Sequence, residues 1–167
     1  MKLKMLFILC FIFFISIGYC QEIKSDISPI GLKKNVIYGT LGVEIEETYY
    51  SLMGNYERMI LELPNSFFNS FWVRIGAGPW AAFDANGGIN YVSTLSAVMG
   101  RRSAHLEIGS GVLFTYDSGE KRFHPLVNDR YLAGNLGFRF QRPGGEFVFR
   151  TGIGWPEFMY LSLGFCF

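Results

Sequence analysis

The chain ends in the stretch MYLSLGFCF, Met159–Phe167, in which large apolar side chains alternate strictly with smaller or more polar ones. The large apolar residues are Met159, Leu161, Leu163, Phe165 and Phe167. A repeat of two residues is typical of a β-strand with two unlike faces. In water, an apolar strand edge at the end of a chain invites pairing with other chains. The stretch therefore predicts a strand whose apolar face meets something other than water.

The composition of the whole chain favours an apolar environment. Of its 167 residues, 50% are hydrophobic and 17% are aromatic, while only 17% are charged, against about 25% in an average soluble domain. The formal net charge of +1 gives no basic surface of the kind that nucleic acids require, so no nucleic-acid partner is expected. These proportions favour a membrane protein.

The N-terminus carries the three parts of an export signal. Lys2 and Lys4 precede the apolar run Met5–Ile17, and small residues flank a tyrosine in Gly18–Cys20. The run is shorter than the roughly 20 residues of a membrane-spanning helix. We therefore predict a signal peptide over residues 1–20, cleaved after Cys20. Lipidation of Cys20 is the alternative, which the bulky tyrosine before it disfavours.

The rest of the chain reads as a polar periplasmic leader over residues 21–34, followed by eight β segments over residues 35–167. Each segment has about 9–12 residues, the length that a tilted strand needs to cross a bilayer. Without a membrane helix, a chain can cross hydrocarbon only as a closed barrel. We therefore predict an all-β fold, an eight-stranded antiparallel up-and-down transmembrane β-barrel. The segments are Asn35–Val43, Tyr50–Leu61, Phe71–Trp80, Ile89–Met99, His105–Tyr116, Tyr131–Gln141, Glu146–Trp155 and Met159–Phe167.

The connections and the aromatic residues predict an orientation. Gly100–Ser103 and Arg142–Gly145 read as tight periplasmic turns, and Asp117–Arg130 reads as a long outer loop. In that loop, Arg122, Phe123 and His124 could form a surface contact. Aromatic residues crowd the strand ends, as in the girdles of membrane barrels. The outer girdle would comprise Tyr50, Trp80, Tyr91, Tyr116, Tyr131, Trp155 and Tyr160, and the inner one Phe71, Trp72, Phe140, Phe147 and Phe167.

The strand face opposite the apolar one combines glycine with arginine and glutamate. An eight-stranded barrel has an interior just wide enough for side chains to fill, and a buried arginine needs a carboxylate partner. We predict a plug of ion pairs, with Glu57 near Arg74 and with Arg150 bound to Asn135. A second group of charged residues, Glu107, Arg139 and Glu146, would meet near the periplasmic end of three neighbouring strands. The network comprises Glu57, Arg74, Glu107, Arg139, Glu146 and Arg150.

The signal peptide, the eight alternating segments and the ending LSLGFCF resemble small eight-stranded outer-membrane barrels of the OmpA/OmpX kind. The stretches NYERM (Asn55–Met59), FWVRIGAG (Phe71–Gly78), Gly100–Val112 and Gly137–Gly152 are similar to a family of uncharacterised outer-membrane proteins. The resemblance implies a monomer in the outer membrane of a Gram-negative bacterium, in contact with its lipid. It also implies that the apolar positions of Met159–Phe167 are read by the barrel-insertion machinery. It brings no catalytic residues.

A structural or surface-interaction role without catalysis, cofactor or metal is the expected function. A narrow pore is one alternative. A lipid A-modifying envelope enzyme is another, with His105 and Glu107 on one strand face as its candidate groups. A soluble exported lipocalin-like binder is the third.

Overall fold

The computed structural model describes residues 31–44, 49–82, 87–100, 102–117, 122–124, 132–155 and 159–167. The expected signal peptide over residues 1–20, with Cys20, lies outside the described residues, as does most of the expected leader. Within the described ranges, no helix is long and apolar enough to cross a membrane.

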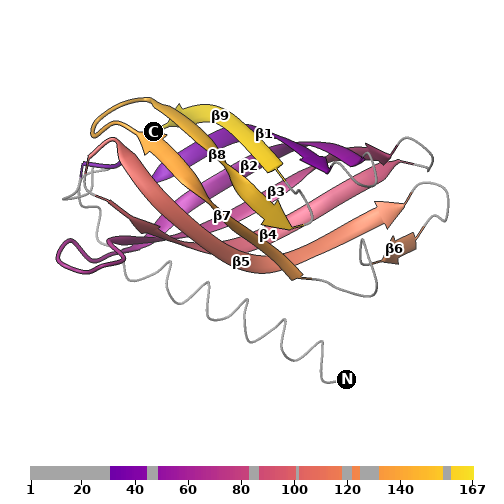
Figure 1. Ribbon diagram of the computed structural model, residues 1–167, viewed down its shortest axis with the longest axis horizontal. Coiled ribbons are helices and arrows are strands. Elements are labelled where there is room, and N and C mark those ends of the chain that lie inside the picture. The colour runs from indigo at the N-terminus through magenta and orange to yellow at the C-terminus, as the bar shows by residue number, and fades with distance from the viewer. Residues whose placement is uncertain are drawn as a thin grey trace, which may run out of the picture.

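Eight long strands form a closed antiparallel barrel (Figure 1). Each long strand pairs with the next one along the chain, and the first pairs with the last to close the ring. The expected all-β, eight-stranded up-and-down barrel is therefore confirmed, and each expected strand boundary lies within two residues of the observed one. The strands are β1 (Asn35–Glu44), β2 (Tyr49–Glu62), β3 (Ser70–Ala82), β4 (Gly88–Met99), β5 (Ala104–Asp117), β7 (Leu132–Gln141), β8 (Phe147–Trp155) and β9 (Met159–Cys166).

A ninth, short strand lies where the sequence predicts only a loop. This strand, β6 (Arg122–His124), runs antiparallel to the end of β5, with Phe123 opposite Tyr116. The pairing of β5 with β7 reaches only to Val112 opposite Leu132. The last residues of β5 therefore have an edge that does not pair with β7, and β6 joins it there. The expected contact residues of the loop thus belong to a strand, and the rest of residues 118–131 lies outside the described ranges.

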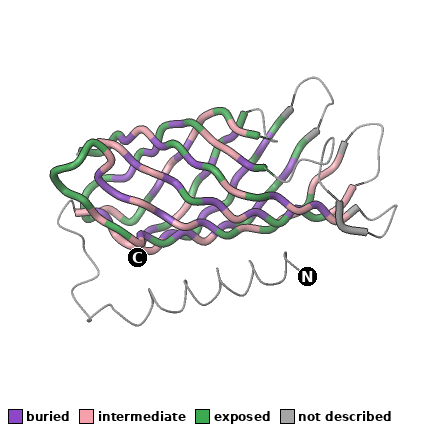
Figure 2. Tube along the Cα trace, turned by 90° about the horizontal axis from the view of Figure 1, so that it is seen from below, coloured by how far each residue is buried: buried purple, intermediate pink, exposed green. Residues whose placement is uncertain are grey.

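Burial alternates along the strands, as Figure 2 shows by the change from purple to green. In β9, Leu161 and Leu163 are exposed, whereas Tyr160 and Ser162 are buried. The same alternation holds in β5, β7 and β8. The faces that the sequence assigns to these strands are therefore the observed ones, with the apolar face outside and the glycine-rich polar face inside.

Both chain termini of the barrel domain lie at the end that carries the tight turns. Asn35 and Phe167 exchange two backbone hydrogen bonds, of 3.1 and 2.9 Å. The turn Arg142–Gly145 is closed by a bond from Gly145 N to the Arg142 carbonyl (2.8 Å), and Gly144 has a φ of +67° that favours glycine. We refer to this end as the turn end and to the opposite end as the loop end.

The aromatic residues do not all face outward as the girdles require. Trp72 and Tyr160 are buried inside the barrel, and Trp80 shares the inward side of β3 with Trp72. In a strand, successive side chains point to opposite faces. Each of these three residues lies between neighbours that face outward, so its own side chain faces inward. On the outer surface, phenylalanines do gather near the turn end, with ring centroids 5.0 Å apart for Phe147 and Phe165.

Candidate functional site

A group of buried charged side chains crosses the barrel interior. Arg139 Nη1 on β7 donates to Glu57 Oε2 on β2 at 2.8 Å, and both side chains are fully buried. The strands β2 and β7 lie on opposite sides of the eight-stranded ring. This ion pair therefore spans the interior rather than joining neighbouring strands.

A second ion pair lies beside the first. Arg150 on β8 donates through Nη2 to Glu107 Oε1 on β5. The two pairs are coupled, because Arg139 Nη1 lies 3.9 Å from Glu107 Oε2 and Arg150 Nη2 lies 4.0 Å from Glu57 Oε1. Each arginine thus contacts both carboxylates. We call these four residues the ionic layer.

Aromatic rings cover the arginines of the ionic layer. The guanidinium carbon of Arg139 lies 3.9 Å from the centroid of the Trp72 ring, and that of Arg150 lies 4.6 Å from the Tyr38 ring. A guanidinium over an aromatic face gains cation–π attraction, the more so where water is excluded. The rings also fill the cross-section that the planar arginines leave open.

Arg74 lies apart from the ionic layer. It stands opposite Glu57 in the register of β2 and β3, as the sequence predicts. Its Nε donates to Asn55 Oδ1 at 2.8 Å, while the Glu57 carboxylate is bound to the arginine of β7. The expected closeness of these two residues is present in the strand register, but their side chains have different partners.

Glu146 requires a correction. The sequence places it in the interior network, whereas its side chain is 74% exposed and lies 3.9 Å from Lys33 Nζ. The strand β8 begins only at Phe147, so Glu146 belongs to the turn and not to the inward face. Asn135 is a second correction, because it donates to Glu107 Oε1 at 2.9 Å instead of accepting from Arg150.

Several interior partners were not foreseen from the sequence. Gln141 accepts from Arg139 Nε at 2.9 Å, and Thr40 forms a hydrogen bond of 2.8 Å with Ser162. These residues lie on the inward positions of their strands, so alternation alone would have placed them inside. Their pairing depends on the register between strands, which the sequence does not specify.

Inward glycines provide the space that the polar side chains occupy. A Cβ on Gly137 would collide with the Tyr160 hydroxyl, and a Cβ on Gly109 would collide with Asn135 Oδ1. Interiors are close-packed, so a side chain at such a position would force its neighbour out. The missing side chains of these glycines thus leave the space that the Tyr160 hydroxyl and the Asn135 amide occupy. We call each such inward glycine position a glycine socket.

The loop-end half of the interior is built differently. It contains an apolar cluster of Met53, Val92, Leu113 and Ala133, which we call the apolar layer. Polar residues are also buried there, and Thr115 donates to Asn90 Oδ1 at 2.9 Å. A cavity of ≈ 20 Å³ lies between this layer and Arg74.

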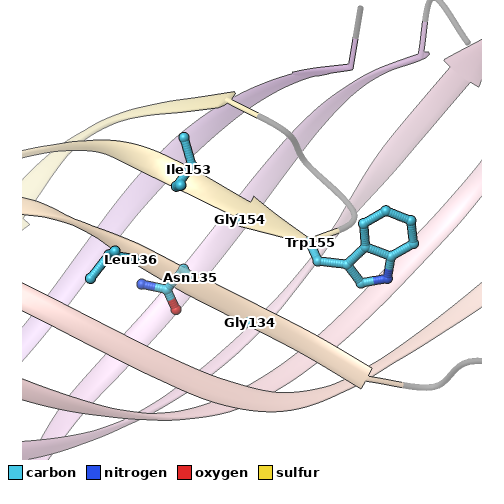
Figure 3. A pocket seen from close by; sticks show the side chains of 6 residues that line it. All are labelled: Gly134, Asn135, Leu136, Ile153, Gly154 and Trp155. Atoms are coloured by element: carbon cyan, nitrogen blue, oxygen red, sulfur yellow. The ribbon is translucent and has the colours of Figure 1, made fainter. Parts of the chain in front are cut away.

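A larger depression, of ≈ 320 Å³, lies in the wall between β7 and β8. Figure 3 shows that Leu136, Ile153 and Trp155 project around it, with two glycines between them. Its lining is almost entirely apolar, so it continues the outer surface of the barrel.

The groups considered for catalysis have structural partners. His105 is buried and its Nδ1 donates to the Gly100 carbonyl at 3.1 Å, while Glu107 belongs to the ionic layer. In the described part of the chain, no group of three or more histidine, cysteine, aspartate or glutamate residues could hold a metal ion. What the interior geometry provides is a filled, charged plug.

Comparison with known proteins assigns no family to the chain. No family model, no curated protein and no solved structure matches it. Membership of the OmpA/OmpX kind therefore stays a prediction from sequence motifs.

Proposed function

We propose that the chain is an integral outer-membrane β-barrel protein with a structural or surface-interaction role, a plugged polar interior and no catalysis. One observation carries the proposal, namely that apolar and charged side chains have exchanged the places they take in a water-soluble barrel. The charged side chains of the ionic layer are buried, whereas large apolar side chains cover the outside.

The outer surface fits a hydrocarbon solvent. Leu163 is 62% exposed, Ile75 is 55% exposed and Leu52 is 58% exposed, although these residues lie on three different strands. Between the rims, no charged side chain among the described residues faces outward; Arg58 lies near the turn end. Soluble monomers rarely expose apolar patches larger than a few hundred Å², so a surface of this kind favours lipid contact.

The turn end supports a specific orientation. It combines the tight turns with both termini of the barrel, as expected for the periplasmic side of an outer-membrane barrel. The apolar positions of β9 and Phe167 would then be the signal for the barrel-insertion machinery. The loop end would face the outside of a Gram-negative cell, where β6 extends the wall beyond β7.

The interior favours a structural role over transport or binding. The ionic layer spans the lumen, so it obstructs a water-filled path, and eight strands leave little width beyond their own side chains. A lipocalin-like binder would need an apolar cavity large enough for a ligand, whereas the cavity beside the apolar layer has only ≈ 20 Å³. A barrel that displays its loop end, as a monomer surrounded by lipid, fits these features.

Site-directed spin labelling of the protein refolded into lipid vesicles tests the proposal. Labels at positions 161, 163 and 165 should be relaxed by oxygen and not by an aqueous nickel reagent. A label at Arg102, which is exposed at the turn end, is the control and should respond to nickel. Nickel accessibility at all of these positions would reject the membrane location.

Planar-bilayer recording separates the structural role from the pore. The purified protein should give no steady conductance. A steady conductance would reject the plugged interior while leaving the membrane location standing.

A further inference from the structure

We propose that the barrel interior binds one chloride-sized anion beside Arg74. The first observation is a charge imbalance among the buried groups. Three arginines are buried in the described interior, but only two glutamates are, and the one buried histidine adds no negative charge. A buried charge without a counter-charge is costly in free energy, so the imbalance calls for a negative partner.

Geometry assigns the surplus charge to Arg74. Both buried carboxylates are bound within the ionic layer by the other two arginines. The hydrogen bond of Arg74 runs from Nε to the neutral amide of Asn55, and the Tyr38 ring centroid lies 5.9 Å from its guanidinium carbon. Among the side chains that the structure describes, no carboxylate oxygen lies within 4 Å of Arg74.

Arg74 borders the cavity on the loop-end side of the ionic layer. The cavity has ≈ 20 Å³, which exceeds the roughly 10–15 Å³ that one water molecule needs. Two hydroxyl groups also line it, those of Thr94 and Tyr160, and both are at least nine-tenths buried. The Thr94 hydroxyl has no hydrogen-bond partner among the described residues, and the Tyr160 hydroxyl lies beside the Asn135 amide, which also lines the cavity.

These groups form a donor set for an anion. A guanidinium and two hydroxyls can all donate to a negative ion, and donation to a charged acceptor is stronger than donation to a neutral one. The apolar side chains of Met53, Val92 and Leu113 line the cavity and keep its polarity low, which strengthens the attraction. The small volume favours a monatomic ion over phosphate or a carboxylic acid, and chloride is the abundant ion of this class.

Thermal unfolding of the refolded protein in detergent tests the site, with chloride compared with gluconate at equal ionic strength. Gluconate is too large for the cavity. Chloride should raise the unfolding midpoint by about 2–4 °C in the unmodified protein and in Arg58→Gln, whose side chain is exposed near the turn end. Arg74→Gln should lose this shift. An equal shift in Arg74→Gln, or no shift in the unmodified protein, would overturn the proposal.

Crystals of the unmodified protein grown in bromide provide a test that does not depend on the variant folding. An anomalous peak in contact with the Arg74 guanidinium and the two hydroxyls is expected. A water molecule there without anomalous signal would overturn the site. Neither experiment depends on the membrane, so the anion site and the proposed function can fail separately.

Discussion

The two halves of the barrel interior are enclosed by the same eight strands but are filled by different kinds of side chain. The ionic layer uses long planar arginines, two carboxylates and the covering rings of Trp72 and Tyr38. The apolar layer uses smaller side chains and leaves a cavity beside it. The barrel thus concentrates its buried ion pairs in one layer, while neutral hydrogen bonds occur elsewhere in the interior. We expect substitutions in the ionic layer to cost far more than those in the other half.

The largest effect is expected from Glu57→Ala, which would leave two buried arginines facing one carboxylate. Removing one partner of a buried ion pair costs about 3–5 kcal/mol in the free energy of unfolding. Urea titration of the barrel in lipid vesicles would measure the loss. Glu146→Ala is the matched control, because that exposed glutamate lies 3.9 Å from Lys33 and should cost about 0–1 kcal/mol. Equal losses in the two variants would refute the importance of the ionic layer.

The contrast between these two glutamates shows what the sequence could predict. Alternation correctly placed the arginines of β7 and β8 inside, because each lies between two outward phenylalanine or threonine residues. It could not place Glu146, since the exact start of β8 decides whether that residue is in the strand or in the turn. Strand ends depend on turn geometry, which the pattern of apolar residues does not specify.

The sequence also did not predict which carboxylate each buried arginine binds. Reasoning from neighbouring strands paired Glu57 with Arg74, whereas Glu57 is bound by Arg139 from the opposite side of the ring. Such a contact depends on the tilt and the stagger of all strands together. The strand count, the outer faces of β3, β5, β7, β8 and β9, and five of the six expected members of the charged network could be predicted. The partners of those members could not.

The second largest effect should come from placing a charge on the outside, where the proposal expects lipid. Leu163→Arg puts a guanidinium in the middle of the apolar band and should cost about 2–4 kcal/mol in a bilayer. Leu61→Arg, near the turn end of β2, should cost about 0–1 kcal/mol because it lies near the headgroups. Unfolding titrations in vesicles would measure both, and equal costs would contradict a hydrocarbon solvent.

A smaller effect is expected from filling one of the glycine sockets. Gly137→Ala would press a methyl group against the Tyr160 hydroxyl and the Thr151 carbonyl, and overpacking costs about 1–3 kcal/mol. Gly39→Ala is the control, since a Cβ there meets nothing within 4 Å. The two variants should differ in unfolding free energy, and a second variant, Gly137→Ala with Tyr160→Phe, should recover part of the loss. No difference between Gly137→Ala and Gly39→Ala would mean that the socket is not tightly packed.

The smallest effect is expected at Thr40, which pairs with Met53 in the register of β1 and β2 and so lies at the depth of the apolar layer. Thr40→Val keeps the shape but removes the hydrogen bonds to Ser162 (2.8 Å) and from Asn55 Nδ2 (3.0 Å). A neutral hydrogen bond contributes about 0.5–1.5 kcal/mol. Because Asn55 Nδ2 also donates to the Met53 carbonyl at 3.1 Å, the lost bond to Ser162 dominates, and the loss in unfolding free energy should be about 1 kcal/mol.

Thr151→Val, on the outward side of β8, is the matched control for Thr40→Val and should leave the unfolding free energy unchanged within about 0.5 kcal/mol. A double-mutant cycle with Ser162→Ala would isolate the contribution of the hydrogen bond itself. The comparison of the two layers depends on the ratio between the losses in unfolding free energy of Thr40→Val and Glu57→Ala. If Thr40→Val cost as much as Glu57→Ala, the stabilising contacts would be spread evenly through the interior, because a neutral contact at the depth of the apolar layer would then equal a charged one that crosses the ring.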